Sequence, residues 1–344
     1  MDVTQLGEFG LIARIQQTLS SPSNPDVLVG IGDDVAVLRA DSDRVWLATG
    51  DIQVEGVHFM QAAVTPFDLG RKALAINLSD IGAKGGRPRF ALVSLGLPRG
   101  LTVEFVDELY KGLKREADDF GTVIVGGNIS RSPSGLFVDI FLLGDAPRNN
   151  VVLRSGAHVG DAILVTGTLG DAAAGLALQS DPGLSATPTY TLTAKAKLAL
   201  PTPRVPEGEW IGASHLATAM LDLSDGLASD LGHICDASQV GARVLAGTLP
   251  VDEENRALAR SAQGDEWSFA LHGGEDYELL FTAPAANVQA IVGGLANATG
   301  TGATVVGEIV PVDAGRRLIL PSGVDVPLGS WGWDHLADQK RGFQ

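Results

Sequence analysis

The residues best suited to chemistry in this 344-residue sequence are aspartates gathered in short polar clusters, most of them beside glycine. Five clusters occur, at 30–34, 49–51, 77–80, 222–226 and 273–278. Turns and helix caps need one carboxylate, not the doublet Asp33-Asp34 or the pair Asp222 and Asp225. Two carboxylates about 4 Å apart repel by roughly 4 kcal/mol at an effective dielectric constant of about 20. If the clusters converge, the pattern therefore predicts a compensating Mg²⁺, which prefers oxygen ligands.

The sequence lacks the common motifs that bind nucleotide phosphates. It contains neither a Gly-x-x-x-x-Gly-Lys-Ser/Thr loop nor the protein-kinase set of motifs. Phosphates would instead be held through metal ions on the aspartates, assisted by backbone amides of the glycine turns and by a few arginines. Arg131 and Arg154 are candidates, although spacing alone favours a surface position for both.

In the first half of the chain, the clusters lie among predicted strands and helices that alternate along the sequence. Apolar residues at helical spacing predict a helix over 4–20, and Pro66 opens a second that ends before Gly85-Gly86. Asn77 and Asp80 share one face of that second helix. A third helix is predicted over 103–120. Strands are predicted over 27–31, 45–49, 90–97, 123–125 and 137–143, which indicates an α/β or α+β layered fold.

A polar, turn-rich segment at 145–150 predicts a domain boundary, with domains at 1–147 and 148–344. The pattern of elements restarts beyond it, and a proline-rich connection runs from Pro182 to Pro206. We find no short-period repeat. The second half has predicted strands at 162–166, 219–221, 277–282, 305–310 and 317–320, and predicted helices at 171–178, after 222–226 and at 285–295.

Composition excludes several classes of protein. The net charge of −16 gives the chain no electrostatic reason to bind nucleic acid or an anionic membrane. With 45% apolar and 19% charged residues, the chain can bury a large core. The lone Cys235 excludes a disulfide framework and is expected to be a packed thiol. Since no apolar run approaches about 18 residues and no signal peptide is visible, we expect no membrane span and a cytoplasmic location.

Seven motifs, in order along almost the whole chain, carry a family resemblance. They include Gly-Ile-Gly-Asp-Asp-Val-Ala-Val-Leu at 30–38, Ala-Leu-Ala-Ile-Asn-Leu-Ser-Asp at 73–80 and Gly-Gly-Glu-Asp-Tyr-Glu at 273–278. The others lie at 50–59, 165–176, 221–231 and 332–335. Together they resemble the thiamine-monophosphate kinases, in the aminoimidazole-ribonucleotide synthetase-like superfamily.

This resemblance implies a two-domain fold and a reaction. An N-terminal α/β domain would bind ATP and Mg²⁺ and pair its sheet with that of a second subunit, and a C-terminal α+β domain would close the cleft. ATP would phosphorylate thiamine monophosphate directly and in line, giving ADP and thiamine diphosphate, the last step in making that cofactor. The acceptor is already an ionised phosphate, so the reaction needs alignment and charge neutralisation rather than a general base.

The resemblance also implies a role for individual residues. The metal ligands would be Asp34, Thr49, Gly50, Asp51, Asp80, Asn128, Asp222 and Asp225. ATP would contact Gly127, Asn128, Arg154 and Ser224. Thiamine monophosphate would contact His58, Glu275 and Trp333, since an aromatic face and a carboxylate suit the cationic thiazolium ring.

Two positions depart from the family pattern. Asn128 stands where the family has a metal-binding aspartate, which predicts weaker binding at one metal position or a compensating ligand nearby. Gly50 stands where the family commonly has threonine or serine. These departures keep a nucleotide-binding sensor without catalysis as an alternative, and aminoimidazole-ribonucleotide synthetase is the nearest enzymatic alternative.

Several polar residues have simpler explanations than chemistry. Asp276 is expected to serve a turn or a helix cap, and Asp33 to serve either the turn or the metal. His233 and His272 are expected to be structural, and Tyr110 to pack in the core.

Overall fold

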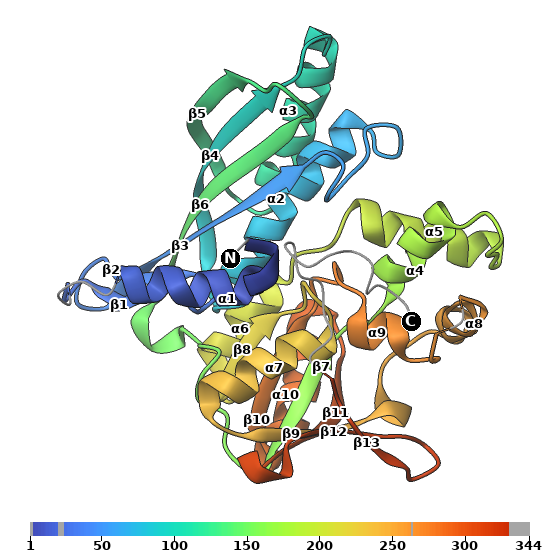
Figure 1. Cartoon of the computed structure of the whole chain (residues 1–344). Coiled ribbons are helices and arrows are strands. Elements are labelled where there is room, and N and C mark those ends of the chain that lie inside the picture. The colour runs from blue at the N-terminus through green and yellow to red at the C-terminus, as the bar shows by residue number, and fades with distance from the viewer. Residues whose placement is uncertain (1–2, 20–23, 263, 330–344) are drawn as a thin grey trace.

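The computed structural model describes residues 3–19, 24–262 and 264–329, which form two β-sheets with their own helices (Figure 1). The two sheets lie on either side of residue 147 in the sequence, while the boundary at 147 and 148 stays a prediction. The N-terminal sheet has six strands in the order β1-β2-β3-β6-β4-β5. They are β1 (Val27–Val29), β2 (Ala36–Arg39), β3 (Arg44–Val54), β4 (Arg87–Leu97), β5 (Val123–Arg131) and β6 (Phe137–Pro147).

Helices α2 (Pro66–Gly82) and α3 (Val103–Asp119) cover one face of this sheet (Figure 1). The hydroxyls of Thr65 and Thr102 cap the two helices, and Pro66 begins α2 as predicted. The helices pack closely because Gly70 faces the backbone of α3, where a Cβ would lie 2.0 Å from the carbonyl oxygen of Leu109.

The other face of the N-terminal sheet is open in the single chain. Along β6, Val138, Ile140 and Leu142 are buried under the helices, whereas Phe141 points the other way and is 45% exposed. Strand β3 runs to Val54 because all eleven of its residues pair with β6, so it is longer than the predicted strand 45–49. Other apolar residues with exposed side chains on the N-terminal sheet include Ile52, Phe90, Leu92, Val123, Val125 and Ile129.

The C-terminal sheet has seven strands in the order β13-β12-β9-β11-β7-β10-β8. Neighbours in this sheet are antiparallel except for β9 and β12, which are parallel. The strands are β7 (Asp161–Thr166), β8 (Ala219–Asp222), β9 (Gly241–Leu245), β10 (Leu279–Pro284), β11 (Ala303–Val310), β12 (Arg316–Ile319) and β13 (Asp325–Pro327).

Helices cover both faces of the C-terminal sheet. Ile163 and Val165 of β7 pack with the helix α7 (Leu227–Ser238) and with α9 (Ser268–His272), while Leu164 packs on the opposite face. That second face is covered by α6 (Val205–Ser214) and α10 (Val288–Thr299). Cys235 of α7 is buried in the first core, which confirms the predicted packed thiol, and burial raises its pKa to about 12.

A separate helical layer contains α4 (Asp171–Ser180), α5 (Pro188–Ala199) and α8 (Glu253–Ser261). Helix α5 lies within the segment 182–206 that was expected to be a connection, so that expectation is wrong. Thr187 caps it and Pro188 begins it, and these start signals identify a helix even in a proline-rich segment. Short 3₁₀ turns occupy Arg148–Asn150, Ala246–Thr248, Ala285–Asn287 and Val312–Ala314.

The first helix, α1 (Val3–Thr18), forms where the apolar stripe predicts it. The stripe is not a core face in the single chain, because Phe9, Ile12 and Ile15 are each at least 36% exposed. None of the described helices is both long and apolar enough to cross a membrane.

Candidate active site

Strand β3 and helix α2 bring the first predicted ligands together. Thr49, Gly50 and Asp51 lie inside β3, which extends beyond the predicted strand 45–49. The hydroxyl of Thr49 donates a hydrogen bond to Asp80 of α2, at 2.5 Å between Oγ1 and Oδ2. Three residues earlier on the same helix, the Asn77 amide oxygen accepts from the Asp51 backbone N–H at 3.1 Å. The predicted i, i+3 pair of α2 therefore faces β3.

The carboxylate of Asp222 joins this group from the C-terminal sheet. Asp222 is the last residue of β8, and its Oδ2 accepts a hydrogen bond from the Ser79 hydroxyl at 2.5 Å. Ser79 precedes Asp80 on α2, so neighbouring residues of one helix contact β3 and β8. The site therefore lies where the two sheets meet.

Burial and mutual repulsion perturb these carboxyl groups. Burial raises the pKa of Asp80 well above its usual range, and the charges of Asp51, Asp222 and Asp34 raise it further. Burial likewise raises the pKa of Asp222, with the charge of Asp34 as the next largest cause. The predicted convergence of aspartates is thus present in the structure for Asp34, Asp51, Asp80 and Asp222.

Two cations lie against the Asp33-Asp34 doublet. The ammonium of Lys84 forms ion pairs with Asp33 at 2.8 Å and with Asp34 at 2.6 Å. The guanidinium of Arg154 contacts the other oxygen of Asp34, at 2.6 Å from Nε to Oδ1. Burial alone would raise the pKa of Asp34, but Lys84 and Arg154 hold it below its usual value. Asp33 also accepts the backbone N–H of Asp34, so it serves the turn and an ion pair together.

Asp225 lies in a different polar group at the start of α7. The buried Asp230 accepts the backbone N–H groups of Asp225 and Gly226, both at 3.1 Å. Asp225, Asp230 and His233 each place a ligand atom within 4.8 Å of the others, a spacing that could hold a metal ion. His233 also packs against the ring of Phe9, and burial lowers the pKa of His233 to about 4.

Glu275 is held in a strained segment between the two sheets. Glu275 and Tyr277 have φ values of 69° and 51°, a left-handed conformation that costs non-glycine residues energy and that concentrates at functional sites. The backbone N–H of Glu275 donates to the carbonyl oxygen of Ser224. Its carboxylate forms an ion pair with the nearly buried Lys72 of α2 at 2.7 Å, and Lys72 also donates to the carbonyl oxygen of Leu198.

His58 lies in the turn after β3. Its Nδ1 accepts a hydrogen bond from the Val54 backbone N–H at 3.0 Å, and this bond fixes the orientation of the ring. His58 follows β3 of the N-terminal sheet, whereas Glu275 precedes β10 of the C-terminal sheet.

Gly127 and Asn128 are not brought to the other predicted ligands within one chain. Both lie on the edge strand β5, where Gly127 pairs with Val93. Val93 of β4 pairs with Ile140 of β6, and Ile140 pairs with Asp51 of β3. The two strands β4 and β6 therefore lie between Gly127 and Asp51. At about 4.8 Å per strand, the two backbones are about 14 Å apart.

The remaining candidates have simpler positions. Arg131 is exposed at the end of β5, whereas Arg154 is not the surface arginine that its spacing favoured, because it contacts the buried Asp34. Tyr110 packs against the N-terminal core. Asp276 accepts the N–H of Gly170, the N-cap residue of α4, so it contacts the start of a distant helix and is not itself the N-cap residue that was expected. Trp333 lies outside the described residues.

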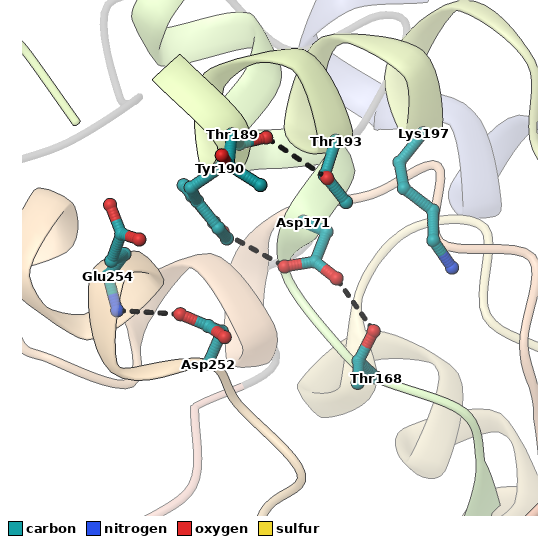
Figure 2. A pocket seen from close by; sticks show the side chains of 8 residues that line it. All are labelled: Thr168, Asp171, Thr189, Tyr190, Thr193, Lys197, Asp252 and Glu254. Atoms are coloured by element: carbon teal, nitrogen blue, oxygen red, sulfur yellow. Dashed lines mark hydrogen bonds between the residues drawn. The ribbon is translucent and has the colours of Figure 1, made fainter. Parts of the chain in front are cut away.

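A polar pocket of about 330 Å³ lies apart from these residues, between α4, α5 and α8 (Figure 2). The side chains of Thr168 and Tyr190 donate hydrogen bonds to the carboxylate of Asp171, and all three residues line the pocket. Lys197 and Asp252 also line the pocket (Figure 2). None of the predicted site residues lines this pocket.

The residues that converge between the sheets fit a hard divalent cation. The donors are all oxygens: the carboxylates of Asp34, Asp51, Asp80 and Asp222, with the hydroxyl of Thr49. Carboxylates that raise one another's pKa are stabilised when a cation lies between them. The chemistry of this donor set is the kind that Mg²⁺ prefers.

Comparison with known proteins follows the same division of the chain. Residues 32–146 match the family described as AIR synthase related protein, N-terminal domain, and residues 158–319 match AIR synthase related protein, C-terminal domain. The thiamine-monophosphate kinase of Escherichia coli K12 is 38% identical over 336 residues, covering 96% of this chain and 98% of that protein. The chain belongs to the thiamine-monophosphate kinase family. The resemblance seen in the motifs is thereby confirmed.

Other members of the family agree with this assignment. The thiamine-monophosphate kinase of Aquifex aeolicus is 39% identical over 83% of this chain and 88% of its own length. The solved structure of AaThiL complexed with AMPPCP and TMP has a TM-score of 0.82 at 35% identity, covering 97% of this chain and 99% of that one. The predicted two-domain fold is therefore that of the family.

Four residues that contact predicted site residues were not themselves predicted from the sequence. Ser79 stands in the same motif as Asp80, so its position next to a predicted ligand was a usable signal. Asp230 stands in the same 221–231 motif as Asp225, and that proximity was a second signal. Lys72 and Lys84 gave no such signal, because their partners are more than 40 residues away in the sequence.

Proposed function

We propose that this chain transfers the γ-phosphoryl group of ATP to thiamine monophosphate, giving thiamine diphosphate. The observation that carries the proposal is the convergence of four carboxylates from both sheets, Asp34, Asp51, Asp80 and Asp222, in a member of the thiamine-monophosphate kinase family. The structure of AaThiL with AMPPCP and TMP supports ATP as the phosphoryl donor.

The charges of the site account for how two anions could meet there. Both substrates carry phosphate groups, and the converging aspartates would repel them if nothing lay between. Mg²⁺, held by Asp34, Asp51, Asp80 and Asp222 with Thr49 as a lesser ligand, would neutralise and orient the phosphates. The residues of the chain would then align the two substrates, and no general base is required because the acceptor phosphate is already ionised.

The remaining predicted residues extend the proposal. We place Asp225, Asn128 and the backbone of Gly50 as further metal ligands, and Gly127, Arg154 and Ser224 at ATP. The side-chain orientation of His58 and the ion pair of Glu275 with Lys72 support their assignment to the acceptor, together with Trp333.

A homodimer is also part of the proposal. The face of the N-terminal sheet away from α2 and α3 exposes large apolar residues, among them Leu92 and Phe141, and an apolar face of this kind is typical of an interface. Asn128 pairs with Ser94, on the same side as Leu92, and so lies next to this face. Analytical ultracentrifugation should give the mass of two chains, and a monomer at micromolar concentration would contradict this part of the proposal.

A coupled assay for ADP release tests the function directly. With thiamine monophosphate, ATP and Mg²⁺, we expect turnover that Asp51→Ala abolishes, because the substitution removes a carboxylate from the centre of the site. The exposed Asp313 of the C-terminal domain provides the matched control, and Asp313→Ala should retain activity. Binding of ATP without turnover on thiamine monophosphate would instead identify a nucleotide-binding sensor.

A further inference from the structure

Two cations hold Asp34 in different ways. Lys84 is fully buried, and its ammonium contacts Asp33, Asp34 and the carbonyl oxygen of Met220 on β8, the last at 2.7 Å. The contact with Met220 is a hydrogen bond, and the contacts with Asp33 and Asp34 are ion pairs at 2.8 and 2.6 Å. Because Lys84 has no exposed surface, its departure would leave a buried charge without a partner. Lys84 is therefore a permanent partner of Asp34.

The contacts of Arg154 allow its side chain to move without its backbone. Its side chain is 23% exposed, and it lies between η1 (Arg148–Asn150) and β7, in a segment that is neither helix nor strand. Its backbone N–H donates to Asp33 at 3.1 Å, which anchors the main chain independently of the guanidinium. The side chain can therefore leave Asp34 while the backbone stays in place.

The contact of Arg154 with Asp34 is also unusual in its geometry. Nε and Nη2 both contact Oδ1, instead of spreading over the two oxygens of the carboxylate. Arg204 in the same chain shows the usual arrangement, since its Nε and Nη2 donate to different oxygens of Glu278 at 2.7 and 2.6 Å. The forked pair is the stronger one. At Asp34 the ammonium of Lys84 lies 2.6 Å from Oδ2, the oxygen that a forked guanidinium would also contact.

We propose that Arg154 is an exchangeable counter-ion of Asp34, and that Lys84 is the positioning residue that keeps it exchangeable by occupying Oδ2. In the metal-free protein Arg154 covers Oδ1. When a metal ion and nucleotide phosphates bind, Arg154 gives up Oδ1 and turns to the phosphates, while Lys84 remains in place. Metal binding and the presentation of Arg154 to the nucleotide are then one linked event. The proposal rests on the proposed function in one respect, the assignment of Asp34 as a metal ligand.

The substitution Lys84→Met tests the proposal, because the proposal and simple electrostatics predict opposite changes in the affinity for Mn²⁺. Methionine fills the apolar volume of the lysine stem but leaves Oδ2 free, so Arg154 can fork over Asp34 and compete better with a metal ion. Binding of Mn²⁺ in the absence of nucleotide, measured by electron paramagnetic resonance, should become about 10- to 100-fold weaker. Simple electrostatics predicts the opposite, because removing a positive charge should strengthen Mn²⁺ binding.

Two further variants complete the experiment. Adding Arg154→Gln to Lys84→Met should restore Mn²⁺ binding at least to the wild-type affinity, because the competing guanidinium is gone. Arg89→Gln removes a positive charge that pairs with Asp145 on the N-terminal sheet, and its effect measures the influence of net charge alone. Tighter Mn²⁺ binding by Lys84→Met than by the wild type would overturn the proposal.

The outcomes also separate this proposal from the proposed function. If Lys84→Met does not fold, as judged by circular dichroism, the single variant Arg154→Gln provides the test. Unchanged or weaker binding of Mn²⁺ by Arg154→Gln in the absence of nucleotide would overturn the proposal. A wild-type protein that binds Mn²⁺ but does not phosphorylate thiamine monophosphate would refute the function and leave the exchange of Arg154 standing. A wild-type protein that binds no Mn²⁺ would refute the metal assignment and this proposal together.

Discussion

Replacing Asp222 by asparagine should stabilise the metal-free protein at pH 8 while removing activity. Asparagine keeps the shape of the side chain and an oxygen that can accept the hydrogen bond from the Ser79 hydroxyl. It removes a negative charge that burial and Asp34 make unfavourable, since they raise the pKa of Asp222 to about 7. The residue thus contributes to function at the expense of stability.

The size of the effect follows from the shift in pKa. Each unit between the folded and unfolded pKa corresponds to about 1.4 kcal/mol, so the shift from 3.8 to about 7 sets an upper limit of about 4 kcal/mol. Burying the amide of asparagine offsets part of this gain, and we expect about 2 kcal/mol at pH 8. Because the folded pKa is raised, the destabilisation is fully present above pH 7 and is lost as the pH falls toward 4.

The assay is denaturant unfolding in EDTA at pH 8, 6.5 and 5, for the wild type and Asp222→Asn. The advantage of the variant should shrink by up to about 1.4 kcal/mol per pH unit between pH 7 and pH 5. Adding Mg²⁺ at pH 8 should stabilise the wild type more than the variant. The exposed Asp313→Asn is the control and should change the free energy of unfolding by less than about 0.5 kcal/mol.

The reasoning would be refuted if Asp222→Asn were less stable than the wild type in EDTA at pH 8. It would also be refuted if the difference between the two proteins did not depend on pH. Either result would mean that the carboxylates of the site do not repel one another in the metal-free protein.

Two further predictions concern the acceptor and the metal. Lys72→Met removes the ion pair that orients Glu275, so the KM for thiamine monophosphate should rise about tenfold while that for ATP changes little, as steady-state kinetics can show. Equal changes in both KM values would contradict a role for Lys72 on the acceptor side. Asn128→Asp should lower the Mg²⁺ concentration for half-maximal activity, because it adds a charged ligand, and an unchanged Mg²⁺ dependence would count against Asn128 as a ligand.

Local patterns were sufficient to predict the elements that carry the site. The apolar spacing of α2 placed Asn77 and Asp80 on one face, and the structure confirms that both contact β3. The strand before Asp222 was recognisable from its apolar run and the polar turn that follows. These features depend on residues that are close in the sequence, where helix and strand periods act directly.

Long-range contacts could not be predicted in the same way. Lys84 follows α2 in a glycine-rich turn, and its contacts with Asp33 and with Met220 depend on how two sheets pack together. Helix α5 is not evident from the sequence because a proline-rich segment is typical of an irregular connection, although Pro188 begins the helix. The displacement of Asn128 from Asp51 depends on strand order, which the sequence of a single chain does not reveal.

Helix α2 and the turn after it contact the site at Lys72, Ser79, Asp80 and Lys84, reaching both sheets. One inserted or deleted residue would rotate every later side chain by about 100° and shift it by about 1.5 Å along the axis. Such a change between Lys72 and Lys84 would misplace several partners at once, and no single substitution could restore them. The number of residues between Lys72 and Lys84 is therefore as important to the site as the side chains at those positions.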